Sequence, residues 1–320
     1  MAKGVRMTDR IAQEWVYRWQ LWQQLHEQGG PMGVSPQRLR TLGLYGGAQG
    51  IWVDKARTAT LTADGVGITV GVLHTGTAYA DDLSEDGILY HYPHTHRPSA
   101  RDRAEIQATK AAGSLGLPLF VMTGSGARFT QRNVHLGWVK GWDDEAQLFL
   151  ITFGETRPLQ LLQGGGDERP FVLVEPRAPV RREVAARQGQ QRFKFLVLQR
   201  YGVCCAVCDL RILEVLDAAH LRPKHMQGSD DPRNGLVFCA VHHRAFDAGF
   251  FAIEPRTLRV HCRPLGPDAS ALQLRHLSLA HLSKQPYPTA LEWQWQRWKT
   301  RYKGEIAPHL FSVAREEAGC

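Results

Sequence analysis

Two short pairs of metal-binding residues constrain the fold of this chain more than any other feature of its sequence. The first pair is Cys205 and Cys208, within C-C-A-V-C, and the second is Cys239 and His242, within F-C-A-V-H-H. Each pair has two intervening residues, so each can hold one side of an ion from a single turn. Three thiolates and an imidazole match a tetrahedral structural zinc site. Cys204 adjoins the first pair, and only the spacing favours Cys205 as the ligand.

Polar residues that such a zinc site does not require lie among these pairs. They are His220 in D-A-A-H-L-R-P, Asn234 in N-G-L-V-F-C, and His243 directly after the second pair. This order of residues resembles that of the HNH nucleases. The resemblance implies that His220 is the general base, that Asn234 fixes the loop and the base, and that His243 binds a catalytic divalent ion, Mg²⁺ or Mn²⁺. These residue types suit phosphodiester hydrolysis, which needs a base to deprotonate water and an ion to stabilise developing negative charge.

The same resemblance predicts the local fold, because HNH nucleases are built on a β-hairpin followed by a helix. It places the first strand and its turn at 217–223, the second strand at 234–239, and the helix at 240–249, where Gly249 ends it. A helix over 192–201 is expected to lead into this zinc-stabilised module.

One position departs from the family pattern. Many HNH enzymes carry an acidic metal ligand just before the first histidine, and that residue is Ala219 here. Asp217 is the candidate second ligand of the catalytic ion, although on a regular strand it would face away from His220 unless the strand bends. Asp247 follows His243 by one helical turn and is expected to brace it.

The N-terminal half has a different pattern. Residues 8–28 are expected to form a helix, because tryptophans and other apolar residues recur there at helical spacing before a Gly-Gly-Pro stop. From residue 36 to 155, short apolar runs between turn residues predict a curved β-sheet or open barrel, interrupted by one helix over 101–115. The expected strands lie at 50–53, 66–73, 87–92, 117–122, 135–139 and 148–153.

A second specific motif lies inside this β-rich segment, H-T-G-T-A-Y-A-D-D-L-S-E-D-G-I-L-Y-H-Y-P at 74–93. It resembles the SRA domains, which read 5-methylcytosine by flipping the base out of the duplex. The resemblance implies a base-binding pocket made by Tyr79, Asp82 and Tyr92. Two aromatic rings would replace the lost stacking, and a carboxylate would accept a hydrogen bond from the cytosine amino group. The second half of the motif departs from the family, whose Thr-Gly is Pro93-His94 here.

The net charge of +8 is unevenly placed along the chain. Residues 156–200 carry 9 Lys/Arg against 4 Asp/Glu, and residues 263–320 carry 8 against 5, whereas the two motif-bearing segments are nearly balanced. A solvated linker would show the same excess. Beside a nuclease motif, however, the positive charge favours contact with DNA phosphates.

Composition indicates a soluble globular protein, with 43% hydrophobic and 22% charged residues in a length of 320 that accommodates two domains. No apolar run reaches the length of a membrane span, and the first ten residues lack the apolar core of a signal peptide. Of the six cysteines, four cluster at 204–239, which indicates metal binding in a reducing compartment. We therefore expect a cytoplasmic protein without membrane contact.

Together these patterns predict an α+β chain of five parts. They are an N-terminal helical segment (1–35), an SRA-like domain (36–155), a basic linker (156–192), an HNH domain (193–262) and a helical tail (263–320), with a trailing helix at 289–302.

The chain as a whole resembles the SRA–HNH modification-dependent restriction endonucleases of the McrA type. The resemblance implies cleavage of double-stranded DNA near 5-methylcytosine or a derivative, for restriction of foreign methylated DNA. Because one HNH site cuts one strand, a double-strand break suggests a homodimer. Two alternatives stay open: a non-catalytic methylated-DNA-binding protein with a structural zinc module, and an unspecific HNH nuclease.

Overall fold

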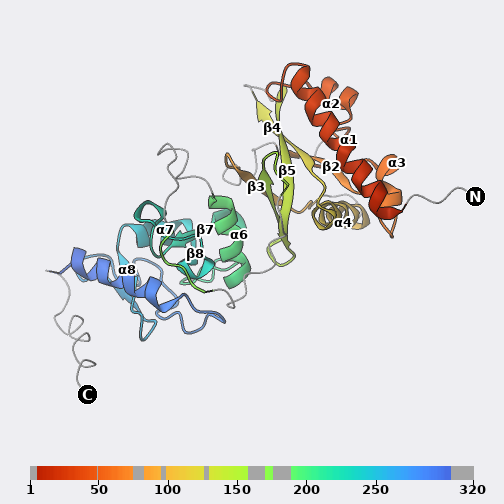
Figure 1. Ribbon diagram of the computed structural model, residues 1–320. Coiled ribbons are helices and arrows are strands. Elements are labelled where there is room, and N and C mark those ends of the chain that lie inside the picture. Colours follow the sequence, from red (N-terminus) through yellow and green to blue (C-terminus); the bar gives the residue numbers. More distant parts are fainter. Residues whose placement is uncertain are drawn as a thin grey trace, which may run out of the picture. The chain divides into compact units, whose positions relative to one another are not determined.

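The computed structural model describes residues 6–48, 50–74, 83–94, 99–125, 130–157, 170–175 and 189–303. The chain divides into two compact units, Met1–Gln163 and Gly164–Cys320, each with its own sheets and helices (Figure 1). The first unit contains the expected β-rich segment, and the second contains both zinc-ligand pairs.

Six strands of the described chain form one mixed sheet in the first unit. They are β1 (Gly50–Val53), β2 (Thr69–His74), β3 (Gly87–His91), β4 (Leu119–Ser125), β5 (Gln131–Asp143) and β6 (Leu148–Phe153). The order is β1-β2-β4-β5-β6-β3, with β2 and β4 parallel and the other neighbours antiparallel. Because the order begins at β1 and ends at β3 without closing, the described strands form an open sheet. A bulge between Val139 and Gly141 interrupts the register of β5 and bends it.

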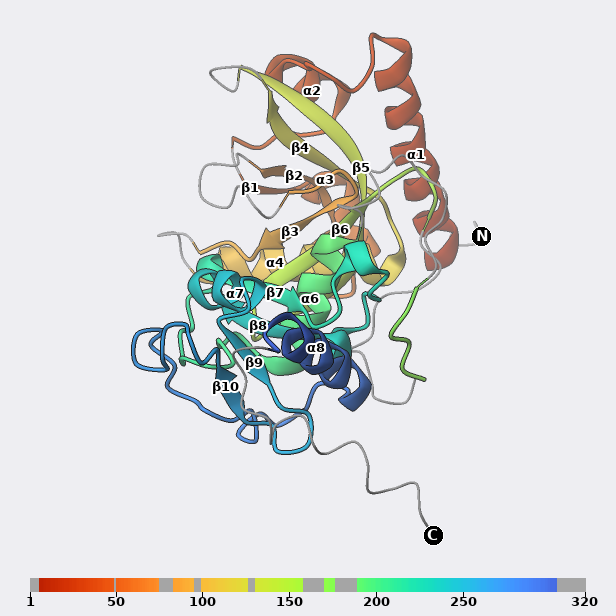
Figure 2. The same ribbon diagram turned by 90° about the vertical axis from the view of Figure 1, so that its left-hand side faces the viewer.

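Helices pack against both faces of this sheet. Successive residues of a strand face opposite sides, so neighbouring residues can belong to different cores. In β4, Phe120 belongs to a core that it shares with Leu25 of α1 (Met7–Glu27) and Leu39 of α2 (Pro36–Leu42). The next residue, Val121, belongs to a second core that includes Ala112 of α4 (Ser99–Leu115). Figure 2 shows α1 running along the sheet beside β5.

A buried ion pair fixes α1 to the sheet. Arg18 is fully buried, and its guanidinium donates to Oε1 of Glu14 at 2.7 Å. The same group donates to the carbonyl oxygens of Pro118 at 2.7 Å and Thr69 at 2.8 Å, just before β4 and at the start of β2. The helix is therefore part of the hydrophobic core of the first unit.

The second unit contains the ββα arrangement that the sequence predicts. Strand β7 (Leu216–His220) pairs antiparallel with β8 (Gly235–Cys239), and α7 (Ala240–Asp247) follows directly. Gly249 has φ +77° just after this helix, the left-handed conformation that glycine adopts most readily at a helix end. The predicted hairpin, helix and stop signal are thus confirmed.

Further elements pack around this ββα core. Helix α6 (Gln190–Tyr201) lies against β8 (Figure 1), so close that a Cβ on Gly235 would be 2.6 Å from the Phe193 ring. The hairpin of β9 (Phe251–Ile253) and β10 (Val260–Cys262) follows α7, and Ala252 of β9 packs with aromatic residues of α8 (Pro288–Arg301). The short helices are α3 (Lys55–Thr58), η1 (Ala59–Leu61), η3 (Leu213–Val215), η4 (Lys224–Met226) and η5 (Pro232–Asn234).

Within the described ranges, none of the helices combines the length and the apolar character that crossing a lipid bilayer requires.

Candidate active site

The four predicted zinc ligands lie together at the base of the second unit's hairpin. The Sγ atoms of Cys208 and Cys239 are 3.9 Å apart, and Nδ1 of His242 is 3.1 Å from Sγ of Cys239 and 3.6 Å from Sγ of Cys205. All four ligand atoms lie within 4.8 Å of one another. Tetrahedral zinc with bonds of about 2.0–2.3 Å places its ligand atoms about 3.5–3.8 Å apart, so the cluster has the dimensions of a zinc site.

The surroundings of the cluster also suit a metal. Nε2 of His242 is 2.8 Å from the carbonyl oxygen of Leu272, which directs the Nδ1 atom toward the sulfurs. Burial raises the pKa of the Cys208 thiol to about 12, so a bound cation has to displace its proton at neutral pH. The cluster contains Cys205 and does not include Cys204.

His220, the expected general base, stands at the end of β7 between an aromatic ring and a carboxylate. Its ring stacks on Phe193 of α6, with centroids 3.6 Å apart and planes within 9°. Its Nε2 lies 3.2 Å from Oδ1 of Asp230, whose Oδ2 accepts from Nζ of Lys224 at 2.5 Å. Burial would raise the pKa of Asp230, but the hydrogen bonds from His220 and Lys224 outweigh it and lower this pKa. The carboxylate is therefore ionised beside the imidazole.

Asn234 is completely buried and joins the two ends of the loop after β7. Its Oδ1 accepts from the backbone N–H of Arg222 at 3.0 Å, and its Nδ2 donates to the carbonyls of Arg222 at 3.1 Å and Ser229 at 2.9 Å. The loop is tight here, since a Cβ on Gly228 would lie 1.8 Å from the Arg222 carbonyl oxygen. Asn234 therefore fixes the backbone that follows His220.

His243, the expected ligand of the catalytic ion, lies between two carboxylates. Its Nδ1 is 3.4 Å from Oδ2 of Asp217, and its Nε2 is 3.6 Å from Oδ2 of Asp247. Burial would lower the pKa of His243, but these two carboxylates outweigh it and raise the pKa. Two ligands at about 2.1 Å from one octahedral ion lie about 3 Å apart, so the Asp217–His243 spacing fits a hard divalent cation.

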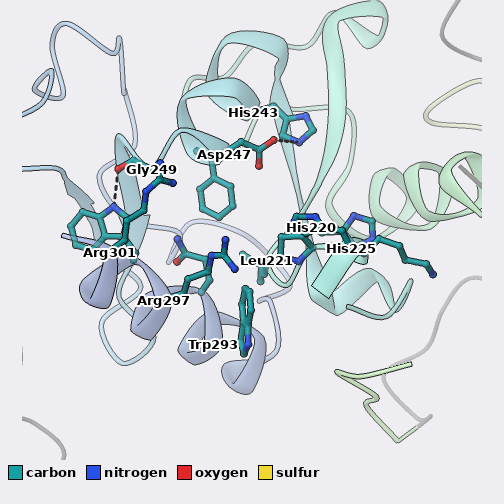
Figure 3. Close-up of a pocket in the computed structure, with 14 residues that line it drawn as sticks. His220, Leu221, His225, His243, Asp247, Gly249, Trp293, Arg297 and Arg301 are labelled. Atoms are coloured by element: carbon teal, nitrogen blue, oxygen red, sulfur yellow. Dashed lines mark hydrogen bonds and ion pairs between the residues drawn. The ribbon is translucent and has the colours of Figure 1, made fainter. Parts of the chain in front are cut away.

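A pocket of about 360 Å³ brings the two histidines to a common space. His220 and His243 line one part of it, together with Asp247. Across from them, Figure 3 shows Trp293 and Arg297, which belong to α8. The pocket thus combines imidazole, carboxylate and guanidinium groups, the set that phosphodiester chemistry uses.

Comparison with protein families agrees with this geometry. Residues 205–254 match the family model described as HNH endonuclease, and the match includes His220, Asn234, His243 and the zinc-ligand cluster. The chain contains an HNH endonuclease domain. This HNH domain accounts for the ββα core of the second unit and makes the protein an endonuclease.

No curated protein matches this chain. Among solved structures, the chain is similar to the "Modification dependent TagI restriction endonuclease", with 16% identity, a TM-score of 0.34, and coverage of 84% of this chain and 93% of that one. It is also similar to the "Type IV phosphorothioation-dependent restriction endonuclease ScoMcrA", with 14% identity, a TM-score of 0.26, and coverage of 87% and 67%.

The expected base-binding residues are described only in part, because Tyr79 and Asp82 lie outside the described residues. Tyr92 is 6% exposed and belongs to the core on the α4 side of the sheet. Its hydroxyl donates to Oδ1 of Asp144 at 2.9 Å, and its ring centroid is 4.6 Å from that of Phe149. Both the ring and the hydroxyl of Tyr92 are thus engaged within the first unit.

Sequence reasoning missed several residues around the HNH site. Asp230 lies in S-D-D-P, a sequence typical of an ordinary turn, so nothing marked it as a partner of His220. Phe193 is far from His220 in the sequence, because the Cys205 and Cys208 pair lies between them. The sequence placed the pocket-lining residues Trp293, Arg297 and Arg301 only within the trailing helix expected at 289–302. Their helical spacing was visible, but their position opposite the histidines depends on tertiary packing.

Proposed function

We propose that the HNH domain hydrolyses DNA with His220 as general base and His243 as a ligand of a divalent ion. The observation that carries this proposal is the shared pocket of the two histidines. Asp230 holds one ring nitrogen of His220 and favours a proton there, which leaves the other nitrogen to accept a proton from water. Phe193 restricts the ring plane, and Asn234 fixes the loop behind it.

The donor set around His243 determines which ion is proposed. One imidazole nitrogen and carboxylate oxygens are ligands that Mg²⁺ and Mn²⁺ accept, with Asp217 as the second protein ligand. When bound, such an ion supplies Lewis-acid stabilisation of charge on the phosphate and the leaving oxygen. Asp247 braces His243 from the next turn of α7.

We further propose that the first unit selects DNA that carries 5-methylcytosine or a close derivative. The motif at 74–93 supports this proposal, with Tyr79, Asp82 and Tyr92 as the pocket residues for a flipped base. Cleavage near the modified base would serve restriction of foreign methylated DNA. A homodimer would supply one HNH site for each strand.

An unspecific HNH nuclease is the second candidate. The placement of Tyr92 favours it, because its ring packs on Phe149 and its hydroxyl bonds to Asp144. The amine of Lys110 also lies over the Tyr92 ring, with its Nζ 5.8 Å from the centroid.

Plasmid cleavage tests these proposals directly. Purified protein is incubated with cytosine-methylated and unmethylated plasmid, with Mg²⁺ or Mn²⁺, alongside the His220→Ala variant. Metal-dependent cutting of only the methylated plasmid, absent in His220→Ala, is the expected result. Equal cutting of both plasmids would favour the unspecific nuclease. Binding of methylated DNA without any cutting would contradict the nuclease proposal and favour a methylated-DNA-binding protein.

A further inference from the structure

Helix α8 presents an aromatic and basic face to the pocket of the HNH domain. Trp293, Arg297 and Arg301 are spaced by four residues, so they lie along one side of the helix. All three line the pocket that also contains His220 and His243. This α8 face lies outside the segment 205–254 that matches the HNH family, so the family pattern assigns it no role.

The helix is held rigidly to the end of α7, which carries His243. The indole N–H of Trp298 donates to the carbonyl of Gly249 at 2.8 Å, and the Tyr302 hydroxyl donates to that of Ala248 at 2.9 Å. A Cβ on Gly249 would lie 2.6 Å from the Tyr302 hydroxyl, so the two segments are in close contact. The α8 face therefore keeps a fixed position relative to the catalytic histidines.

The positive charge of this face is not paired with acidic side chains in the part of the chain that the structure describes. Within the described residues, neither Arg297 nor Arg301 has a carboxylate at ion-pair distance. Lys224 on the same pocket is different, because its amine is paired with Asp230. An exposed arginine pair with no acidic partner is a ready site for an anion.

Trp293 organises the guanidinium groups. The Arg297 guanidinium lies 5.5 Å from the Trp293 ring centroid, and that of Arg222 lies 5.2 Å from the same centroid. Cation–π contact holds planar guanidinium groups with little loss of hydrogen-bonding capacity, because their N–H donors lie in the plane of the group. In Figure 3, Trp293 and Arg297 lie across the pocket from His243.

We propose that the α8 face binds the phosphodiester backbone of the DNA strand beside the bond that the HNH site cuts. This inference rests on the proposed nuclease function and adds the surface that positions the substrate. A DNA backbone fits better than a single small anion, because Arg297 and Arg301 are one helical turn apart and face a pocket that already contains the hydrolytic groups. Each arginine offers a bidentate fork to a phosphate. Arg297 and Arg301 are thus positioning residues.

The salt dependence of DNA binding tests this assignment. Full-length protein carrying His220→Ala, which leaves the DNA uncut, is titrated with a methylated duplex at several salt concentrations, with and without Arg297→Ala and Arg301→Ala. Each lost phosphate contact should reduce the slope of log affinity against log salt by about 0.9. Single-turnover cleavage is measured for the same two substitutions in the wild-type background, where each should lower the rate by about tenfold or more.

Two control variants separate backbone contact from general charge. Arg256→Ala removes the same charge from an exposed position of the second unit that does not line the pocket, and should change neither slope nor rate. Arg297→Lys should keep the salt slope but lose part of the cleavage rate, because lysine lacks the bidentate fork.

These experiments distinguish failure of the α8 assignment from failure of the proposed nuclease function. A wild-type protein that cuts DNA, together with unchanged slope and rate in the double Arg297→Ala, Arg301→Ala variant, would overturn the α8 assignment alone. Equal losses in Arg256→Ala would also overturn it. If the wild type cuts no DNA, the nuclease proposal fails, and the salt slope still decides whether the α8 face binds DNA.

Discussion

At the scale of single residues, the HNH site depends on contacts that connect distant parts of the second unit. His220 closes β7, yet its ring is positioned by Phe193 from α6 and by Asp230 from the following loop. Such a histidine–carboxylate pair fixes both tautomer and ring orientation. The motif predicts that His220 is the general base, and this role stays a prediction. The contacts of its ring with Phe193 and Asp230 could not be predicted, because no spacing rule connects these residues to it.

Asp230→Asn should therefore lower the single-turnover cleavage rate by about 10- to 100-fold while DNA affinity stays near that of the wild type. The amide still fills the space but no longer favours a proton on Nε2 of His220. Glu214→Gln, which neutralises an exposed carboxylate of η3, serves as the matched control. An Asp230→Asn protein with full activity would show that Asp230 has no part in the reaction.

Asn234 supports a prediction about stability instead. Asn234→Asp keeps the acceptor for the Arg222 N–H but replaces the donor that bonds two carbonyl oxygens with a second acceptor. At a fully buried position this should lower the free energy of unfolding by at least about 2 kcal/mol. Denaturant titration followed by circular dichroism measures it, and unchanged stability would contradict the loop-fixing role.

At the scale of elements, the sequence predicted what short-range patterns encode. The β7–β8 hairpin and α7 follow from the ordered motif, and α1, α4, α6 and α8 from helical periodicity, each within about two residues. The β9–β10 hairpin and α2 were not predicted, because three-residue strands and a seven-residue helix carry too little periodicity. The position of α8 on the same pocket as His220 and His243 could not be predicted either, since tertiary packing alone creates it.

The zinc cluster is expected to hold these elements together. It joins the 205–208 turn to the start of α7, and Leu272 extends the connection to the segment before α8. Cys239→Ser should release zinc and unfold the second unit, because a small metal-centred module has little core of its own. Cys204→Ser is the matched control and should retain full zinc content. Metal analysis and thermal unfolding of both variants make the comparison, and a stable, zinc-free wild type would contradict it.

At the scale of the whole molecule, two compact units carry separable proposed tasks, with recognition in the first and hydrolysis in the second. A variant of the recognition pocket should therefore change which DNA is bound without changing the chemistry. Variants of His220 should lower the rate of hydrolysis without changing which DNA is bound. This separation gives the 5-methylcytosine proposal a test that does not depend on cleavage.

Asp82→Ala should lower affinity for a methylated duplex by about tenfold, because it removes the proposed acceptor for the cytosine amino group. Weak, salt-sensitive binding to an unmodified duplex should not change, since phosphate contacts supply it. Tyr92→Ala should lower methylated-DNA affinity similarly, but it should also destabilise the first unit by about 3–5 kcal/mol, because it empties a buried aromatic position.

Tyr92→Phe separates these two effects. It retains the ring that would stack on a base and removes only the hydroxyl bond to Asp144. We expect it to keep the preference for methylated DNA, measured as the ratio of the two affinities at fixed salt. If Asp82→Ala and Tyr92→Ala weaken binding of both duplexes equally, these residues maintain the fold and the modified base is read elsewhere. A wild type that binds both duplexes with equal affinity would instead favour the unspecific-nuclease alternative, with the α8 face and the basic linker supplying the affinity for DNA.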